Sequence, residues 1–532
     1  MARSSPRAPV VDRTGWAILL TLGFGVSLVI MDATIVNVAL PVVMRDLGLD
    51  ASDAQWVNAS YALMFAALLM TVGRLGDLHG RRRLFAAGLV LFMAASVVAG
   101  LSTGAAMLIG ARFAQGIAAA MIVPSTLSIL NATFVGRART IGFAVWGSAI
   151  GGMAAVGPVV GGWLATDVSW RWAFWLNIPL GLLVLAGVLR AVPESRDSSA
   201  EPGRDPYGVA LSALGMGGIV FALIESSWFG WWRQDSGALS PVPFALMAGL
   251  LLMAVFVRVE LRRGRRGHHV LVDLGLFRLP TFRAGVVAAL LVAFGEFGLL
   301  FTLPLLMQGT LGYSALGTGG VILVLALGTF VASGSLPQLS HLLPQRAIVQ
   351  IGLVLEVVAL GGLAATLAMS VSTWLLSGWL FVYGMGVGMA TAQLTSLLLS
   401  DVPRDESGQA SGLQSSVRQL GSALGVALLG GLLVSDLARS TRDRLGALGL
   451  PDETVRTVTG LVKDSAGIAI SGLQADPQSQ PIARAAEEAM IHASRLTTGM
   501  GALALVVGFA ATFALPRAAM KPEDLADQAP TA

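Results

Sequence analysis

The 532-residue chain contains no cysteine and little charge. The absence of cysteine excludes disulfides, thiolate metal sites and cysteine nucleophiles. Asp, Glu, Lys and Arg together supply 12% of the residues, which is about half the share usual in a soluble protein. No glycine-rich phosphate-binding motif followed by Lys and Ser or Thr occurs, so nothing predicts direct use of ATP.

Long hydrophobic runs make up most of the chain. It is 55% hydrophobic, with a mean hydropathy of +0.74 and 64 glycines. Apolar stretches of roughly twenty residues are long enough to span a bilayer as helices, and small residues let such helices pack closely in lipid. We therefore predict an all-α integral membrane protein. Its fourteen transmembrane helices are expected near residues 16–41, 54–73, 84–103, 106–128, 139–165, 171–190, 207–228, 240–258, 282–307, 314–339, 347–369, 373–399, 409–434 and 496–515.

The arginines predict the orientation of these spans. The net charge is +4 and the pI is 9.9, but most arginines lie in short loops on one predicted side, as membrane topology requires. No nucleic-acid partner is therefore expected, and both termini are predicted to be cytoplasmic. Residues 16–41 are too long for the apolar part of a cleavable signal peptide. The arginines on the predicted cytoplasmic side include Arg3, Arg7, Arg13, Arg137, Arg139, Arg258, Arg262, Arg263, Arg265 and Arg266.

Three longer segments separate some of the spans. Residues 191–206 and 259–281 are polar or basic and are predicted to be cytoplasmic linkers. Residues 435–493 fall on the outer side by parity, and long loops translocate largely regardless of their charge. Leu437 to Leu450 and Ile482 to Met490 have apolar residues at helical spacing, which predicts amphipathic helices. We interpret the segment mainly as a solvated spacer, with a cap over the outer mouth or contact to an extracytoplasmic partner as the alternatives.

The segment 73–83 stands out between two predicted spans. It combines Gly73, Asp77, Gly80 and Arg81 with further arginines in a short turn. Glycines permit a tight turn, and an acid in such a turn is well placed to face the positive end of a neighbouring helix. The segment is either a loop that only fixes the topology or a conformational latch.

Four runs give the chain a specific resemblance. The segment 73–83 resembles the loop after the second helix of the major facilitator superfamily. Residues 32–41 are similar to the first-helix signature of its fourteen-span drug:proton antiporter group, and Trp170 to Pro179 is also typical of that group. Arg112 to Gly116 resembles the arginine motif of the fourth helix. The glycines around Gly157 and Pro158 resemble the antiporter signature of the fifth helix, where Pro158 is expected to kink the helix.

This resemblance implies the major facilitator fold, with two six-helix bundles and two inserted helices. The substrate would bind between the halves near the midplane, and one half would rock against the other. The implied divisions are residues 1–190 for the N-terminal half, 191–206 for a linker, 207–258 for the inserted pair, 259–281 for a basic linker, 282–515 for the C-terminal half including the outer segment 435–493, and 516–532 for a cytoplasmic tail.

Ionisable residues inside spans are costly in lipid and usually functional. Asp32 matches a family position linked to proton or cation coupling, and the alternative is a structural partner of Arg112. We favour coupling, because burial favours the neutral form of a carboxyl group, and we expect Arg112 to modulate the charge of Asp32. Histidine is absent from the spans, so neither a zinc site nor an imidazole relay is expected at the midplane; the five are His79, His268, His269, His341 and His492.

The C-terminal half offers two buried acids and one cation. Glu296 is predicted to be either a second proton or cation site or the partner of Arg418. Glu356 is an equally good partner for Arg418, or a residue that recognises substrate or cations. Glu225 lies near the end of its span beside several tryptophans, which are typical of the headgroup region. A role of Glu225 in recognising cations stays open.

These residues together predict a secondary transporter that exports amphiphilic drugs or toxic small molecules in exchange for protons. It would need no cofactor beyond the proton gradient, and the resemblance implies the plasma membrane of a bacterium. The alternatives are an exporter of lipids or cell-envelope components, which would work with a partner through 435–493, a dedicated natural-product self-resistance exporter, and a non-transporting sensor. An enzyme is not expected, because no nucleophile, His–acid pair or metal cluster lies at one membrane depth.

Overall fold

The protein is helical throughout the part described by the structure, a computed structural model. It describes residues 11–134, 136–196, 206–233, 238–266, 270, 272, 274–399, 402 and 407–515. No strand occurs among these residues, and one isolated β-bridge joins Arg233 and Leu239. The helices are α1 (Arg13–Leu47), α2 (Ala51–His79), α3 (Arg81–Gly100), α4 (Ala105–Thr133), α5 (Gly136–Trp163), η1 (Leu164–Val168), α6 (Trp172–Trp175), α7 (Asn177–Ala191), α8 (Pro206–Phe229), α9 (Val242–Arg265), η2 (Leu274–Arg278), α10 (Pro280–Gly309), α11 (Ala315–Leu342), α12 (Gln345–Thr366), α13 (Thr373–Leu399), α14 (Ser407–Ala447), α15 (Asp452–Asp464), α16 (Ile470–Ala475), η3 (Pro477–Ser479), α17 (Gln480–Ala511) and η4 (Thr512–Ala514).

The expected membrane spans are present. Within the described residues, 13 helices are long and apolar enough to cross a bilayer. The remaining expected span, 54–73, falls in α2, whose 29 residues reach about 44 Å at the rise of an α-helix. The predicted fold class, an all-α membrane protein of two helix bundles with an inserted pair, is confirmed.

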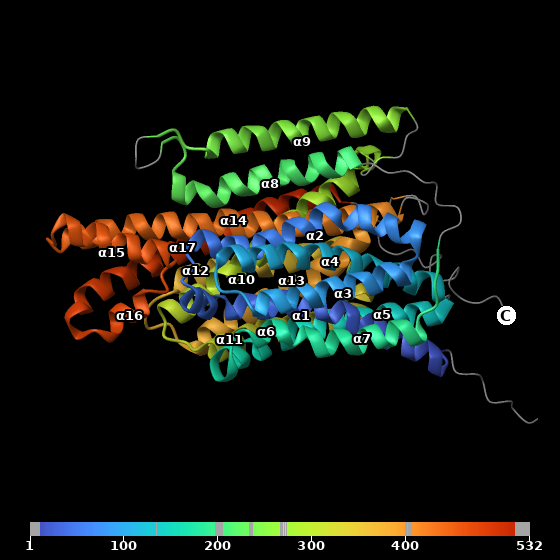
Figure 1. Cartoon of the computed structure of the whole chain (residues 1–532), viewed down its shortest axis with the longest axis horizontal. Helices are drawn as coiled ribbons and strands as arrows, with labels where there is room; N and C mark the ends of the chain where they lie inside the picture. Colours follow the sequence, from blue (N-terminus) through green and yellow to red (C-terminus); the bar gives the residue numbers. More distant parts are fainter. Residues whose placement is uncertain are drawn as a thin grey trace, which may run out of the picture.

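The helices run side by side in one long bundle (Figure 1). Helices α1 to α7 form an N-terminal half, and α10 to α14 with α17 form a C-terminal half. The halves meet where α5 packs on α11 and where α2 packs on α14. The inserted helices do not separate the halves, because α8 packs on the outside of α2 and α14 and α9 packs on α8 (Figure 1).

Glycines on α5 bring three helices close together. A methyl group on Gly161 would lie 2.9 Å from the backbone of Ile35 on α1, and one on Gly162 would overlap the backbone of Ala315 on α11. Such close approach is typical of helices packed in lipid. Helix α5 therefore lies where the core of the N-terminal half meets the C-terminal half.

The turn predicted at 73–83 is much shorter in the structure. Helix α2 continues to His79 and α3 starts at Arg81, so only Gly80 interrupts the two helices. Gly80 has a φ of +115°, which an L-residue with a side chain rarely adopts. The sequence predicted that one helix ends near residue 73 and the next begins at residue 84; both helix ends are wrong, because the polar residues of this segment are still helical. Gly73 and Asp77 lie outside the residues whose side chains are described.

Replacing Gly80 by alanine is expected to destabilise this junction. The new methyl group would lie 2.7 Å from Oε1 of Glu194, in the segment after α7, and the positive φ adds backbone strain of about 1–3 kcal/mol. Gly110→Ala on α4 is the matched control, since its methyl group would meet nothing within 4 Å. Thermal unfolding in detergent should show a lower midpoint for Gly80→Ala only. Equal midpoints for the two variants would contradict this account of the turn.

The segment 435–493 is a folded helical cap and not the solvated spacer that the sequence predicted. Helix α14 continues as one helix of 41 residues to Ala447, and α15, α16 and η3 lead into α17, which begins at Gln480. The amphipathic helices expected at 437–450 and 482–490 are thus largely confirmed as extensions of α14 and α17. Their apolar residues pack against one another, and the fully buried ones include Leu437, Leu445, Val462, Ile470 and Ala486.

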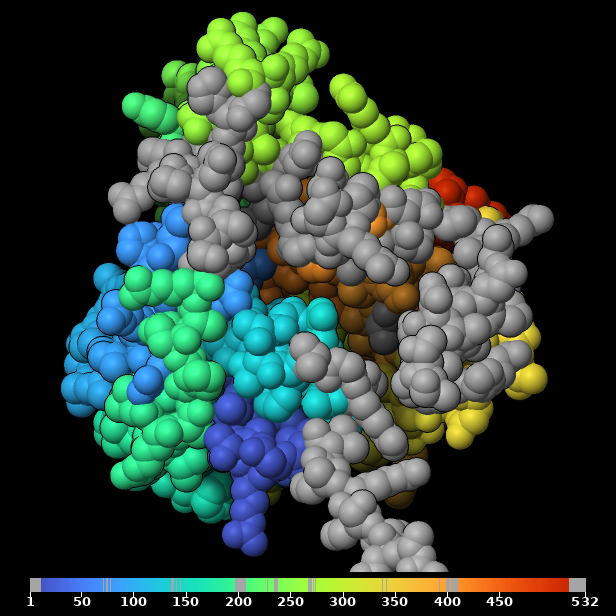
Figure 2. Space-filling model, turned by 90° about the vertical axis from the view of Figure 1, so that its right-hand side faces the viewer, coloured from blue at the N-terminus to red at the C-terminus, as the bar shows by residue number. Residues whose placement is uncertain are grey.

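The cap contacts both halves of the bundle. Gln474 donates to the carbonyl oxygen of Thr310 after α10 at 3.0 Å. The ammonium of Lys463 lies 5.6 Å from the ring centre of Trp228 on α8, and α15 also packs on α2. We call the end that carries α15 and α16 the capped end (Figure 1). Figure 2 looks onto the opposite end, with the N-terminal helices (blue to teal) on one side and the C-terminal helices (brown to yellow) on the other.

Candidate functional site

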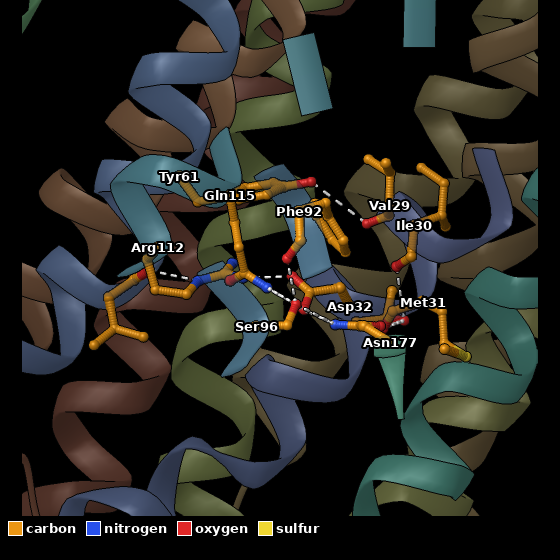
Figure 3. Close-up of polar contacts among 12 residues, drawn as sticks. Val29, Ile30, Met31, Asp32, Tyr61, Phe92, Ser96, Arg112, Gln115 and Asn177 are labelled. Carbon is orange, nitrogen blue, oxygen red and sulfur yellow. Dashed lines mark hydrogen bonds and ion pairs between the residues drawn. The ribbon is translucent and has the colours of Figure 1, made fainter. Parts of the chain in front are cut away.

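A buried carboxylate lies at the centre of the N-terminal half. Asp32 on α1 is 0% exposed and accepts three hydrogen bonds from side chains of other helices (Figure 3). Arg112 Nη1 on α4 lies 2.5 Å from Oδ2. Gln115 Nε2 on α4 and Asn177 Nδ2 on α7 donate to Oδ1 at 2.9 and 2.8 Å. Both carboxylate oxygens are therefore occupied by N–H donors.

Further contacts hold these donors in place. Ser96 on α3 accepts from Gln115 at 2.9 Å and from Asn177 at 3.2 Å. The guanidinium of Arg112 lies 4.3 Å from the ring centre of Tyr61 on α2, a cation–π contact, and its Nε donates to the carbonyl of Val57. Arg112 and Gln115 share one face of α4 because they are three residues apart. Five helices, α1, α2, α3, α4 and α7, thus converge on Asp32.

This arrangement makes the ion pair and a protonated Asp32 incompatible. A carboxylate accepts hydrogen bonds at both oxygens, whereas a protonated carboxyl group carries an O–H that must itself donate. N–H donors face both oxygens of Asp32, so a protonated side chain would lose the ion pair with Arg112 and its O–H would need an acceptor. Breaking a buried ion pair is costly, so the contact between Asp32 and Arg112 fixes how the helices meet here.

The sequence anticipated part of this cluster. The pairing of Asp32 with Arg112 is one of the two hypotheses that we left open for Asp32, and the structure contains that contact. Ser96 and Tyr61 were missed, because neutral polar residues are common in spans and carry no signal of their own. Gln115 and Asn177 belong to the motifs that carry the family resemblance, but their role as ligands of Asp32 was not predicted.

In the C-terminal half, the structure brings Arg418 to Glu296. Arg418 Nη2 on α14 lies 3.5 Å from Glu296 Oε2 on α10. The two side chains are 31% and 15% exposed, so this pair is less buried than Asp32 and Arg112. Glu356 on α12 is fully buried, and neither of its carboxyl oxygens has a hydrogen-bond partner among the described residues. Of the two acids proposed as partners of Arg418, the structure pairs Glu296.

Glu225 lies outside both clusters. Its Oε1 accepts a 2.9 Å hydrogen bond from Nε1 of Trp56, which joins α8 to α2. The side chain is half-buried near the capped end. The tryptophan that Glu225 contacts thus belongs to α2 and is not one of those that follow Glu225 in the sequence.

The segment 73–83 and the glycines around Gly157 lie at contacts between neighbouring segments of the chain. Arg81 donates its backbone N–H to the carbonyl of Ser195 at 3.1 Å, and Glu194 accepts from the backbone N–H of Arg82 at 3.1 Å. The segment after α7 thus covers the start of α3. A methyl group on Gly157 would overlap the hydroxyl of Thr34, two residues from Asp32.

Pro158 sits where α5 crosses the other half. Its backbone lies against Gly319 on α11. Helix α5 runs through Pro158 as an α-helix to Trp163, and the helix changes to π-type at Leu164. The kink expected at Pro158 stays a prediction.

Comparison with known proteins shows the family of this chain. The model of the Major Facilitator Superfamily matches residues 22–426. The chain is 34% identical over 446 residues to a probable actinorhodin transporter of Streptomyces coelicolor, covering 80% of this chain and 75% of that protein. It is 32% identical over 438 residues to the tetracenomycin C resistance and export protein of Streptomyces glaucescens, covering 82% and 79%. The multidrug resistance protein Stp of Mycobacterium tuberculosis is 32% identical over 460 residues, covering 86% and 83%.

Solved structures show the same fold. A bacterial homolog of the human lysosomal transporter Spinster, in an inward-facing and unoccupied conformation, superposes with a TM-score of 0.63 at 16% identity, covering 94% of this chain and 98% of that chain. Within the described residues, no group of three or more His, Cys, Asp or Glu side chains could hold a metal ion. The chain belongs to the major facilitator superfamily, a family of membrane transporters.

Proposed function

We propose that this chain exports amphiphilic, toxic small molecules across the bacterial plasma membrane in exchange for protons. The single observation that carries the proposal is the buried Asp32 held by Arg112, Gln115 and Asn177. The relatives support the substrate class, because their names refer to transport of actinorhodin, to resistance to and export of tetracenomycin C, and to multidrug resistance. Both termini lie in the cytoplasm in this proposal, and the capped end faces outward.

The mechanism follows from the contact between the halves. Gln308 on α10 donates to the carbonyl of Val38 on α1 at 2.9 Å, and Thr166 accepts from the backbone N–H of Leu316 on α11 at 3.0 Å. Both contacts join the halves toward the capped end, which supports a state closed to the outside. Protonation of Asp32 releases Arg112, the halves separate at the capped end, and the substrate leaves. Loss of the proton to the cytoplasm restores the ion pair.

The energy of the proton gradient is sufficient for this exchange. One proton crossing 100 mV supplies about 2.3 kcal/mol, which corresponds to a concentration ratio of roughly fifty-fold per proton. Glu296 is the corresponding acid of the C-terminal half in this proposal. Recognition of substrate or cations by Glu225, Glu356 and Arg418, and an extracytoplasmic partner at the cap, stay predictions.

Reconstitution into liposomes tests the proposal. Liposomes with an acidic lumen should accumulate tetracenomycin C, or ethidium as a fluorescent probe, while lumenal protons are released. Accumulation should stop when a protonophore collapses the gradient. Uptake that continues at the same rate after the gradient is removed would contradict proton-driven exchange.

Cross-linking tests the contact between the halves, and the absence of cysteine makes the native chain a clean background. In the double variant Thr166→Cys/Leu316→Cys, the two residues replaced are already joined by a 3.0 Å hydrogen bond across the halves. Oxidation should form a cross-link and stop export, and reduction should restore it, because the capped end must open in each cycle. The two single variants are the controls. Full export by the cross-linked protein would exclude separation of the halves at this point.

A further inference from the structure

A second polar cluster lies in the C-terminal half. We call Glu296 on α10, Glu356 on α12, Tyr383 on α13 and Arg418 on α14 the two-glutamate cluster. Glu356 and Tyr383 are 0% and 1% exposed. Among the described residues, the two carboxyl oxygens of Glu356 have no hydrogen-bond partner, and the hydroxyl of Tyr383 has none either. Each buried polar atom without a partner calls for an explanation, and these three lie on α12 and α13, which pack against each other.

Glu356 lies inside a helix contact and does not face lipid. A methyl group on Gly386 of α13 would lie 2.6 Å from Cγ of Glu356 and equally close to the backbone oxygen of Gly352 on α12. Gly386 therefore brings the α13 backbone directly against the Glu356 side chain. A leucine or glutamine would satisfy a purely structural role here at lower cost, because an ionisable group in a membrane core is expensive.

If Glu296 and Glu356 were both ionised, their two negative charges would face the single positive charge of Arg418. Gly295, which precedes Glu296 on α10, and Leu360, one helical turn after Glu356 on α12, line the same small cavity, so the helices that carry the two acids meet at one place. Arg418 is the cation of the cluster, and its guanidinium is 3.5 Å from Glu296. A buried carboxylate without a partner takes up a proton instead of remaining charged.

The other helices packed on α12 do not supply a second cation. The sequence of α11 has no Asp, Glu, Lys or Arg. On α17, Arg495 donates to the carbonyl of Leu367, at the C-terminal end of α12, eleven residues or about 16 Å along the helix from Glu356. Arg346, on α12 itself, donates to the carbonyl of Leu515 and lies ten residues, or about 15 Å along the helix, from Glu356. Among the described residues, Arg418 is thus the arginine that pairs with an acid of this cluster.

We propose that the two-glutamate cluster stores one proton, which is shared between Glu296 and Glu356, and that Arg418 pairs with whichever glutamate is ionised. In the state shown, Glu356 holds the proton and Glu296 is the carboxylate. When Glu356 passes its proton to Glu296, Arg418 moves to Glu356 and the net charge of the cluster stays the same. Glu296, at 15% exposure, is the member through which the proton enters and leaves. A role of this proton in transport rests on the proposed function, whereas its storage does not.

Infrared spectroscopy of the purified protein tests the storage directly. The C=O stretching band of a protonated carboxyl group, identified by its shift in heavy water, should be present in the wild type at neutral pH and lost in Glu356→Gln. Glu296→Gln should also lose it, because Arg418 is then free to pair with Glu356. Arg418→Gln should roughly double it, since both acids then need a proton. Asp32→Asn, in the other half, is the control and should leave this band unchanged.

Two results would overturn the proposal. A band of full intensity in Glu356→Gln would mean that Glu356 does not hold the proton, and a band insensitive to both Glu296→Gln and Arg418→Gln would mean that it is not shared. In Glu356→Gln and Glu296→Gln, glutamine is the neutral isostere of the glutamic acid it replaces. If Glu356→Gln does not fold, Arg418→Gln still tests the proposal. If transport by the wild type proves independent of protons while the bands behave as expected, the proposed function fails and the stored proton stands.

Discussion

Asp32→Asn is expected to abolish accumulation of substrate against a gradient. The asparagine keeps the size of the side chain and removes the group that gains and loses the proton. The ratio of substrate concentration inside to outside the liposomes should therefore fall to about one. For one proton exchanged at 100 mV, the wild type should reach roughly fifty-fold. Exchange of labelled for unlabelled substrate at equal concentrations should continue, because it requires rocking of the halves and no net proton transfer.

Asp443→Asn is the control for Asp32→Asn. It changes an exposed acid on the cap extension of α14 and should leave gradient-driven accumulation at the wild-type level. Accumulation by Asp32→Asn at that same level would remove Asp32 from the coupling step. In that case Glu296, which contacts Arg418 and is partly exposed, becomes the residue to test.

The fold was predictable from the sequence because the bilayer sets the length of each apolar run. The same signal failed at helix ends, since hydropathy marks where lipid ends and not where the helix stops. Helix α2 passes beyond the expected end at residue 73 to His79, until Gly80 allows the turn, and α14 passes residue 434 into the cap. Polar residues outside the lipid continue these helices as readily as apolar ones.

The site was predictable only where burial carries a large cost. Asp32 and Arg112 stand out because a charge in a span needs a partner, and the sequence offered their pairing as an alternative. For Arg418 the sequence offered two acids at similar depth, and only the packing of α10 on α14 decides for Glu296. Ser96 and Tyr61 complete the N-terminal cluster through contacts across the fold, which no local pattern encodes.

Arg112→Gln is expected to have the largest effect on stability. It leaves the buried carboxylate of Asp32 with two amide donors and no cation, and breaking a buried pair in this way costs about 3–5 kcal/mol. Thermal unfolding in detergent should show a clearly lower midpoint than the wild type. The double variant Asp32→Asn/Arg112→Gln should regain most of the loss, because neither charge remains buried. A double variant as unstable as Arg112→Gln would mean that the guanidinium matters through Tyr61 and Val57 instead.

The same double variant separates the two hypotheses for this pair. If Asp32 and Arg112 only hold helices together, the neutral pair should restore both the unfolding midpoint and gradient-driven accumulation. If Asp32 carries the proton, the midpoint should recover while accumulation stays near one, because the stabilised protein has no titratable group at this position. We expect the second result, since three N–H donors on one buried carboxylate make the ion pair sensitive to a single proton, whereas helix packing alone does not require an ion pair.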